Sequence, residues 1–127
     1  MYLRAIITLL PAILLGGCFI NPAAGPVIEE AEAGCLTDEQ TGDDYWLLDA
    51  RVTHPDGLDI VNVFVDVEDA DGFEVFSVSL DELEPFYWAA EVVDDPQFLD
   101  CTPGFAYWFT FIAVDENDNQ DESVVVN

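Results

Sequence analysis

From residue 45 onward, apolar and polar residues alternate along most of the chain, which is the pattern of β-strands that bury one face. Five such runs can be followed, and a short Val-rich run from Val124 to Val126 ends the chain. The 3.6-residue period of an amphipathic helix is absent from this region of the sequence. The residues expected to point inward are Leu48, Ala50, Val52, Val61, Val63, Val65, Val67, Phe76, Val78, Leu80, Trp88, Ala90, Val92, Tyr107, Phe109, Phe111 and Ala113.

Turn-forming residues separate these runs. Pro55-Asp56-Gly57 follows the first run, and Asp69-Ala70-Asp71-Gly72 follows the second, where Gly72 can take the positive φ of a tight hairpin. An acidic turn at 81–85, a loop at 94–104 and a turn at 115–121 separate the others. Short strands joined in this way predict an all-β, antiparallel sandwich over residues 45–127.

The segment before this region has a different composition. Residues 19–34 are rich in Ala, Gly, Pro and Glu without a sustained apolar period, so we expect an extended linker there. Residues 35–44 are expected to form an ordered lead-in held by Cys35. We therefore predict an acidic linker and lead-in over residues 18–44, followed by one folded domain over residues 45–127.

The N-terminal residues have the layout of an export signal. A single basic residue, Arg4, precedes an apolar run from Ala5 to Leu15, and the string Leu15-Gly16-Gly17-Cys18 resembles the lipobox of bacterial lipoproteins. The resemblance implies a signal peptide over residues 1–17, attachment of lipid such as palmitate to Cys18, and a membrane anchor in the bacterial cell envelope. A secretory signal cleaved elsewhere and an uncleaved anchor are the alternatives, although the run is shorter than the roughly 18 apolar residues of a membrane-spanning helix.

Three features of the folded region resemble the immunoglobulin-like and fibronectin type III-like domains of bacterial surface proteins. They are the Pro55-Asp56-Gly57 turn, the pattern Tyr107-x-Phe109-x-Phe111-x-Ala113-x-Asp115, and the Asp- and Asn-rich turn before the last Val-rich strand. The resemblance implies an immunoglobulin-like sandwich of about six to seven strands. It also implies that Tyr107 is a tyrosine-corner residue, whose hydroxyl bonds to the backbone upstream.

Charge is the most unusual property of the composition. The chain has 27 Asp and Glu, two Arg and no Lys, and all the acids follow Cys18. Without the predicted signal, which contains Arg4, the net charge is 27 acids minus Arg51, or −26. Such a charge repels phosphate, so we expect no nucleic-acid partner and favour an envelope protein or another cationic partner. The 51% of hydrophobic residues nevertheless predicts a packed core.

Two conditions would relieve the repulsion among these acids. Concentrated salt would screen it, which we favour because the acids are spread along the chain, and bound calcium would neutralise a few carboxylates. The calcium alternative is most specific at Asp115-Glu116-Asn117-Asp118-Asn119, which resembles the calcium linkers of cadherins and offers Asp115, Asn117, Asp118 and Asn119 as ligands. The same residues suit a tight turn, which is the favoured interpretation, and no other cofactor is expected.

The cysteines divide into one lipidation residue and one pair. With Cys18 lipidated, Cys35 and Cys101 remain in a compartment that permits disulfides. Their bond would close a loop of 67 residues, which are residues 36–100 and both cysteines. Two free thiols or a metal site are the alternatives, but a single His and the absence of closely spaced cysteines argue against zinc.

Two aromatic residues are candidates for binding. On the strand from Tyr107 to Ala113, the face opposite the core presents Trp108, and Tyr87 is out of phase with the inward Trp88. Trp108 shares its face with Thr110, Ile112 and Val114. We expect the segment Tyr45-Trp46 to cover this face. The alternative is that Trp108 and Tyr87 receive a partner or a sugar ring.

No catalytic residue is predicted, and the chain is not expected to be an enzyme. His54, the only imidazole, stands beside a turn Pro and is expected to be solvent-exposed. We expect a non-catalytic, lipid-anchored envelope protein that acts as a structural or protein-interaction module. The alternative is a calcium- or carbohydrate-binding surface domain.

The residue after the lipobox cysteine bears on localisation. In some bacteria an Asp at this position marks retention in the inner membrane, whereas here the residue is Phe19. We therefore expect the protein in the outer membrane, on its periplasmic or surface face.

Overall fold

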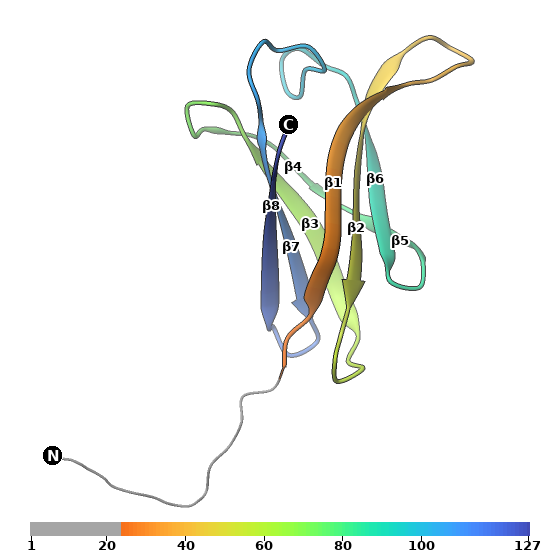
Figure 1. The fold of residues 1–127 in the computed structure, drawn as a ribbon, viewed down its shortest axis with the longest axis vertical. Helices are drawn as coiled ribbons and strands as arrows, with labels where there is room; N and C mark the ends of the chain where they lie inside the picture. Colours follow the sequence, from red (N-terminus) through yellow and green to blue (C-terminus); the bar gives the residue numbers. More distant parts are fainter. Residues whose placement is uncertain (1–23) are drawn as a thin grey trace, which may run out of the picture.

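The computed structural model describes residues 24–127, in which all regular secondary structure is β-strand (Figure 1). The predicted signal peptide, residues 1–17, and the predicted lipidation residue Cys18 lie outside the described residues. In the described part of the chain, no helix is long and apolar enough to cross a membrane. The eight strands are β1 (Val27–Thr37), β2 (Asp44–Thr53), β3 (Ile60–Glu68), β4 (Glu74–Ser79), β5 (Asp81–Glu84), β6 (Tyr87–Val93), β7 (Trp108–Asp115) and β8 (Gln120–Val126).

The strands form two four-stranded sheets that pack face to face. One sheet has the order β1-β2-β6-β5 and the other has the order β4-β3-β7-β8, and every strand pair is antiparallel. The predicted all-β antiparallel sandwich is confirmed. Eight strands replace the expected six to seven because β1 and β5 were not predicted.

The core lies between the two sheets and is built from the inward residues of each strand. In β2, β3 and β7 the predicted period of two is confirmed, since alternate side chains are almost completely buried. Trp46 also points inward, and its ring lies 5.0 Å from Phe109 and 5.9 Å from Tyr107, measured between ring centroids. The fully buried large side chains are Leu48, Val52, Val63, Val65, Val67, Leu99, Phe109, Phe111 and Asp115.

Strand β1 corrects the predicted linker. It pairs with β2 from Val27 opposite Thr53 to Thr37 opposite Asp44, with one irregularity between Ile28 and Glu30. Residues 27–34 therefore belong to the sheet, and the expectation of an extended linker is wrong for them. The strand escaped prediction because its inward residues are small: Ala33 is buried and Ala31 packs against the core.

Two further differences arise at strand irregularities. Residues 81–84, which were expected to turn the chain, form β5 and pair with β6, and the turn itself lies at Pro85 and Phe86. Val61 was expected to point inward but is 57% exposed, because a register shift between Ile60 and Asn62 reverses the alternation at the start of β3.

The sandwich has two ends, which we name by where the chain enters it. At the entry end, β1 begins beside the β2–β3 loop (residues 54–59), the β5–β6 turn and the β7–β8 turn (residues 116–119), at the bottom of Figure 1. The far end carries the β1–β2 loop (residues 38–43), the β3–β4 turn (residues 69–73) and the β6–β7 loop (residues 94–107).

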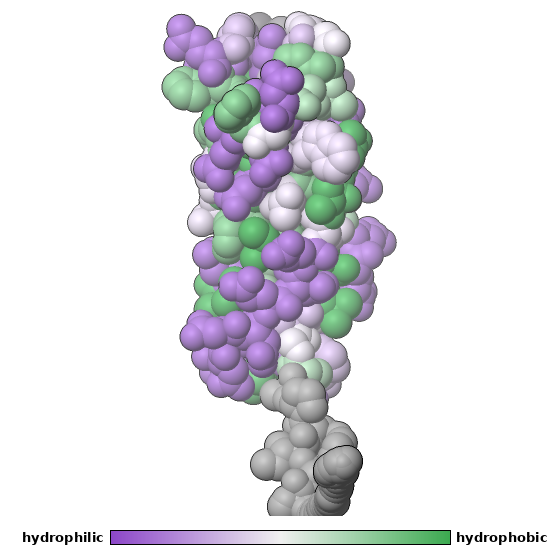
Figure 2. Space-filling model, turned by 90° about the vertical axis from the view of Figure 1, so that its left-hand side faces the viewer, coloured by the Kyte–Doolittle hydropathy of each residue, from purple (hydrophilic) through white to green (hydrophobic). Residues whose placement is uncertain are grey.

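The first and last strands lie side by side and close one edge of the sandwich. The Ile28 backbone N–H donates to Asp121 Oδ2 at 2.8 Å, and Asn127 Nδ2 donates to the Ala33 carbonyl at 2.5 Å. Figure 2 shows the side of the molecule on which β8 and the β3–β4 turn lie, and there hydrophobic residues reach the surface in small groups between hydrophilic ones.

Candidate functional site

A disulfide between Cys35 and Cys101 ties the far end of the sandwich, as the cysteine count predicted. The two Cα atoms are 5.9 Å apart, and the bond joins β1 to the β6–β7 loop. Cys35 thus lies within a strand, not in a lead-in before the first strand. The long loop is also ordered by hydrogen bonds, since the Cys101 N–H donates to Asp94 Oδ1 at 2.8 Å.

Tyr107 fixes the same loop from its other end. Its ring is buried against Trp46, and its hydroxyl accepts a hydrogen bond of 2.9 Å from the Asp100 backbone N–H, seven residues upstream. This contact has the form that a tyrosine corner requires, a hydroxyl bonded to upstream backbone. The β6–β7 loop is therefore held at both of its ends.

The two aromatic binding candidates are not brought together. Trp88 and Phe109 point into the core, so their neighbours Tyr87 and Trp108 lie on the outer faces of different sheets. Trp108 is 51% exposed, and the expected cover is wrong because Trp46 lies inside the core instead. One shared site made of Trp108 and Tyr87 is therefore not formed.

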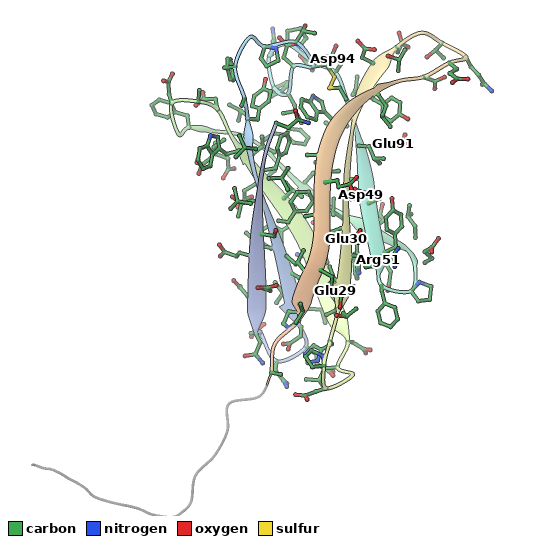
Figure 3. All side chains as sticks on the ribbon, in the orientation of Figure 1. Glu29, Glu30, Asp49, Arg51, Glu91 and Asp94 are labelled. Atoms are coloured by element: carbon green, nitrogen blue, oxygen red, sulfur yellow. A yellow bond between two sulfur atoms is a disulfide. The ribbon has the colours of Figure 1, made fainter. Side chains whose placement is uncertain are left out.

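The Tyr87 face is dominated by charge. Tyr87 lies opposite Arg51 in the sheet and donates a hydrogen bond of 2.7 Å from its hydroxyl to Asp49 Oδ2. That bond, burial and the carboxylate charges of Asp49, Glu84 and Glu32 together raise the pKa of Tyr87 to about 12. The Arg51 guanidinium lies 5.8 Å from the centre of the Tyr87 ring and forms no ion pair with a described carboxylate. Figure 3 shows Arg51 among Glu29, Glu30, Asp49 and Glu91 on this sheet.

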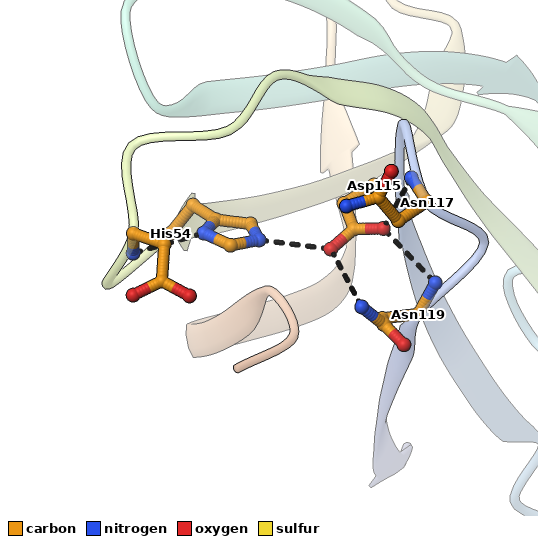
Figure 4. Close-up of polar contacts among 5 residues, drawn as sticks. His54, Asp115, Asn117 and Asn119 are labelled. Atoms are coloured by element: carbon orange, nitrogen blue, oxygen red, sulfur yellow. Dashed lines mark hydrogen bonds and ion pairs between the residues drawn. The ribbon is translucent and has the colours of Figure 1, made fainter. Parts of the chain in front are cut away.

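Asp115, the last residue of β7, organises the β7–β8 turn at the entry end (Figure 4). Its Oδ1 accepts the backbone N–H groups of Asn117 at 2.8 Å and Asn119 at 2.9 Å, while its Oδ2 faces the Asn119 amide nitrogen at 3.4 Å and His54 Nε2 at 2.8 Å. Burial alone would raise the pKa of Asp115, but the hydrogen bonds from His54, Asn119 and Asn117 outweigh it and hold the pKa below its ordinary value. The carboxylate is a turn-capping group whose oxygens are both in use.

His54 reaches this carboxylate from the β2–β3 loop, and its expected solvent-exposed role is wrong. Its side chain is 3% exposed, and its Nδ1 accepts the Asp56 backbone N–H at 3.1 Å. Because Nδ1 is an acceptor, the ring proton belongs on Nε2, which donates it to Asp115. Both ring nitrogens are therefore used to join the β2–β3 loop to the β7–β8 turn, and a second bond, from the Glu116 N–H to the Asp59 carbonyl at 3.1 Å, supports the same junction.

The proposed calcium ligands do not converge in this geometry. Asp118 sits in the turn with a φ of 65° and its side chain is exposed, whereas Asp115 is buried with its oxygens directed to turn N–H groups and His54. Among residues 24–127, no group of three or more His, Cys, Asp or Glu side chains is placed to hold a metal ion. The geometry follows the turn interpretation of these residues.

Sequence reasoning missed the pairing of His54 with Asp115 and the shared outward face of Val124 and Val126. The His54 partner lies 61 residues away, so no local spacing signals it. Val124 and Val126 carry a signal that could have been read, since two valines at the same parity of a C-terminal strand share one face. Comparison with protein-family models, with curated proteins and with solved structures found no match for this chain.

Proposed function

We propose that this chain is a non-catalytic protein, anchored through lipid on Cys18 in the outer membrane of a bacterial envelope. Its sandwich acts there as a structural or protein-interaction module. The observation that carries the proposal is the position of the lipobox cysteine directly ahead of a folded domain. Cys18 precedes Val27, the first residue of β1, by nine positions (27 minus 18).

That spacing keeps the domain close to the membrane. Nine residues span at most about 30 Å when fully extended, which is comparable with the length of the sandwich strands themselves. The high negative charge would repel anionic lipid and favour an upright sandwich, with its entry end toward the membrane and its far end away from it.

Strand order supports an immunoglobulin-like sandwich. In that family one sheet has the order A-B-E-D and the other contains C-F-G, with C′ added beside C in larger variants. The orders β1-β2-β6-β5 and β4-β3-β7-β8 correspond to A-B-E-D and C′-C-F-G. The Tyr107 hydroxyl bond to the Asp100 backbone is a second point of agreement. Such domains commonly present surfaces to other proteins, which fits an interaction module.

The anchor is tested by replacing the lipobox cysteine. Cys18→Ser should abolish incorporation of labelled palmitate and shift the chain from the membrane fraction to a soluble or misprocessed form. Gly17→Ala is the matched control, because it keeps a small residue before the cysteine and should retain both lipid and membrane fractionation. A Cys18→Ser variant that is processed and fractionates like the wild type would rule the anchor out.

A further inference from the structure

The outer side of β7 and β8 carries an apolar stripe, which we call the β7–β8 face and define as Trp108, Thr110, Ile112, Val124 and Val126. In the antiparallel register Trp108 lies directly opposite Val126, and Thr110 lies opposite Val124. Side chains so placed have Cβ atoms about 5 Å apart, so each of these two pairs is in contact across the strands. Trp108, Val124 and Val126 are 51%, 53% and 51% exposed.

The outer side of the other sheet mixes charged residues with apolar ones such as the exposed Leu36 and Val93. There the central strand β2 presents Asp49 and Arg51, whereas the outer residues of β7, from Trp108 to Val114, carry no charge. An outer sheet face is normally solvated and polar. An apolar face of this kind on an otherwise highly charged molecule marks a place where another surface is bound.

Carboxylates border the β7–β8 face on both sides. Glu68 and Asp66 of β3 lie opposite Trp108 and Thr110, and Glu122 of β8 lies opposite Ile112. Asp66 is held in place by the Ser77 hydroxyl, which donates to its Oδ1 at 2.7 Å. The face is thus an apolar centre with a negative rim, and a partner must satisfy both.

We propose that the β7–β8 face binds a partner protein whose surface has an apolar centre flanked by Lys or Arg. The inference rests on the proposed function as an interaction module and names its surface and the chemistry of its partner. A complementary charge at the rim steers association and selects the partner, while burial of the apolar centre supplies the affinity.

A second copy of the chain does not fit this surface. The only Lys or Arg residues are Arg4 and Arg51, and Arg51 lies on the outer face of the opposite sheet. Two copies meeting through their β7–β8 faces would bring one acidic rim against the other, because Glu68, Asp66 and Glu122 would find no cation on the facing copy's face. The cations that the rim requires must therefore come from a different protein.

The size of the face agrees with a protein partner. The two strands of the face, about 4.8 Å apart and about 17 Å long from Trp108 to Ile112, cover roughly 160 Å². A standard interface buries about 800 Å² on each partner, with an apolar core and a polar rim. The face would form the apolar centre of such an interface, and the acidic residues of β3 and β8 would belong to its rim.

Trp108 itself reports on binding. Of the three Trp residues, Trp46 and Trp88 are buried and Trp108 is half-exposed, so acrylamide quenching of the intact chain reads mainly Trp108. The probe is an eight-residue peptide of alternating Lys and Val, which as a strand can turn its Val side chains to the face while the long, flexible Lys stems reach around to the flanking carboxylates. It should protect Trp108 from acrylamide in the purified full chain, measured with phosphatidylcholine nanodiscs present. An alternating Lys-Ser peptide should bind at least tenfold more weakly, and an alternating Glu-Val peptide should give no protection.

Variants locate the site. Val124→Thr with Val126→Thr keeps the side-chain shape, removes two apolar groups and should weaken the Lys-Val peptide at least tenfold. Leu36→Thr with Val93→Thr makes the same kind of change in the other sheet and should leave affinity unchanged. A basic peptide could instead bind in the acidic hollow lined by Asp38, Asp43, Asp44, Glu91 and Asp94. We expect Glu91→Gln to leave the affinity for the Lys-Val peptide unchanged.

Several results would overturn the proposal. Equal binding of the Lys-Ser and Lys-Val peptides would show that charge alone accounts for the affinity. A loss of affinity in Glu91→Gln would place the peptide in the acidic hollow. Protection of Trp108 by cellohexaose instead of the peptide would favour a carbohydrate ligand. Protection that grows with the concentration of the chain, in the absence of a probe, would favour a second copy as the partner. Palmitate incorporation is measured on the same samples, so a failed anchor with intact peptide binding, or the reverse, separates this inference from the proposed function.

Discussion

Each end of the sandwich is held by a prominent long-range side-chain contact, but the two contacts are of different kinds. At the far end a covalent bond joins Cys35 to Cys101, and at the entry end a hydrogen-bonded pair joins His54 to Asp115. The disulfide acts mainly on the unfolded chain, whose freedom it reduces, whereas the His54–Asp115 pair exists only in the folded state. The far end should therefore respond to reductant and the entry end to acid.

The largest effect is expected from opening the far end. Cys35→Ser with Cys101→Ser should lower the free energy of unfolding by about 4 kcal/mol, the loop-closure value for 67 residues. Urea denaturation measures this, and the slope m should rise because the unfolded chain becomes more open. A reductant should produce the same shift in the wild type and none in the double variant. Unchanged stability on reduction would show that the hydrogen bonds of the β6–β7 loop hold this end alone.

The entry end is tested by two substitutions at Asp115 that remove different sets of bonds. Asp115→Ala leaves the N–H groups of Asn117, Asn119 and His54 without acceptors, so Tm should fall by roughly 10 °C. Asp115→Asn keeps an oxygen for the turn but turns an NH₂ group toward His54 Nε2, and should lower Tm by about half as much. Equal losses in the two variants would mean that the contact with His54 adds nothing to the turn.

Acid should weaken the entry end selectively. The pKa of Asp115 is below its ordinary value of 3.8, so its contribution to stability is present above about pH 4 and is lost as the pH falls through the lowered folded-state pKa. The difference in unfolding free energy between the wild type and Asp115→Asn should therefore shrink below pH 4, whereas the disulfide contribution should not change. Taking the difference cancels the other carboxylates, which titrate in both proteins. A gap that is independent of pH would contradict the carboxylate role.

A smaller effect is expected at the far end from Tyr107→Phe. The change removes the acceptor of the Asp100 N–H and keeps the ring in the core, so it should cost about 1 kcal/mol. Thermal or urea unfolding measures the loss, and Tyr45→Phe serves as a control on a half-buried tyrosine that makes no such contact in the described residues. A loss near 4 kcal/mol would mean that the Tyr107 hydroxyl, and not the disulfide, is the main tie of this end.

The smallest effect is expected from calcium. If the β7–β8 turn bound calcium, the entry end would gain a second tie, worth about 2.7 kcal/mol at a hundredfold excess over the dissociation constant. We expect calcium at micromolar concentration to leave Tm unchanged, and sodium chloride to raise it by screening the acidic surface. A calcium-specific rise in Tm that is lost in Asp118→Asn would restore the calcium interpretation.

Most of the sandwich could be predicted from local alternation, because strands β2, β3 and β7 bury alternate side chains almost completely. Strand β1 could not be predicted in this way, since small inward residues such as Ala31, which stands between Glu30 and Glu32, give almost no hydropathy signal. Strand β5 could not either, because all four of its residues are exposed. The predicted inward orientation of Val61 was wrong for another reason, because a single irregularity in the strand register moves a residue to the opposite face of the sheet.

The candidate sites were less predictable than the fold. The Cys35–Cys101 bond followed from counting cysteines, and the exposure of Trp108 is consistent with its parity in β7. The cover expected from Trp46 overlooked that this residue shares its parity with Leu48 and Val52, which points it into the core. The burial of His54 depends on a partner on a distant strand, and a turn Pro beside it carries no information about that partner.

The disulfide also decides how tension would travel through an anchored molecule. A pull on Cys18 enters the sandwich at Val27 and runs along β1 to Cys35, where the covalent bond passes it to Cys101 and on toward β7. The residues between the two cysteines are bypassed, so strands β2 to β6 would carry no tension along the chain. Only β1 up to Cys35 can be peeled away, which lengthens the chain by a few tens of ångströms at most. A partner held at the β7–β8 face would thus be coupled to the membrane by a short, nearly inextensible path.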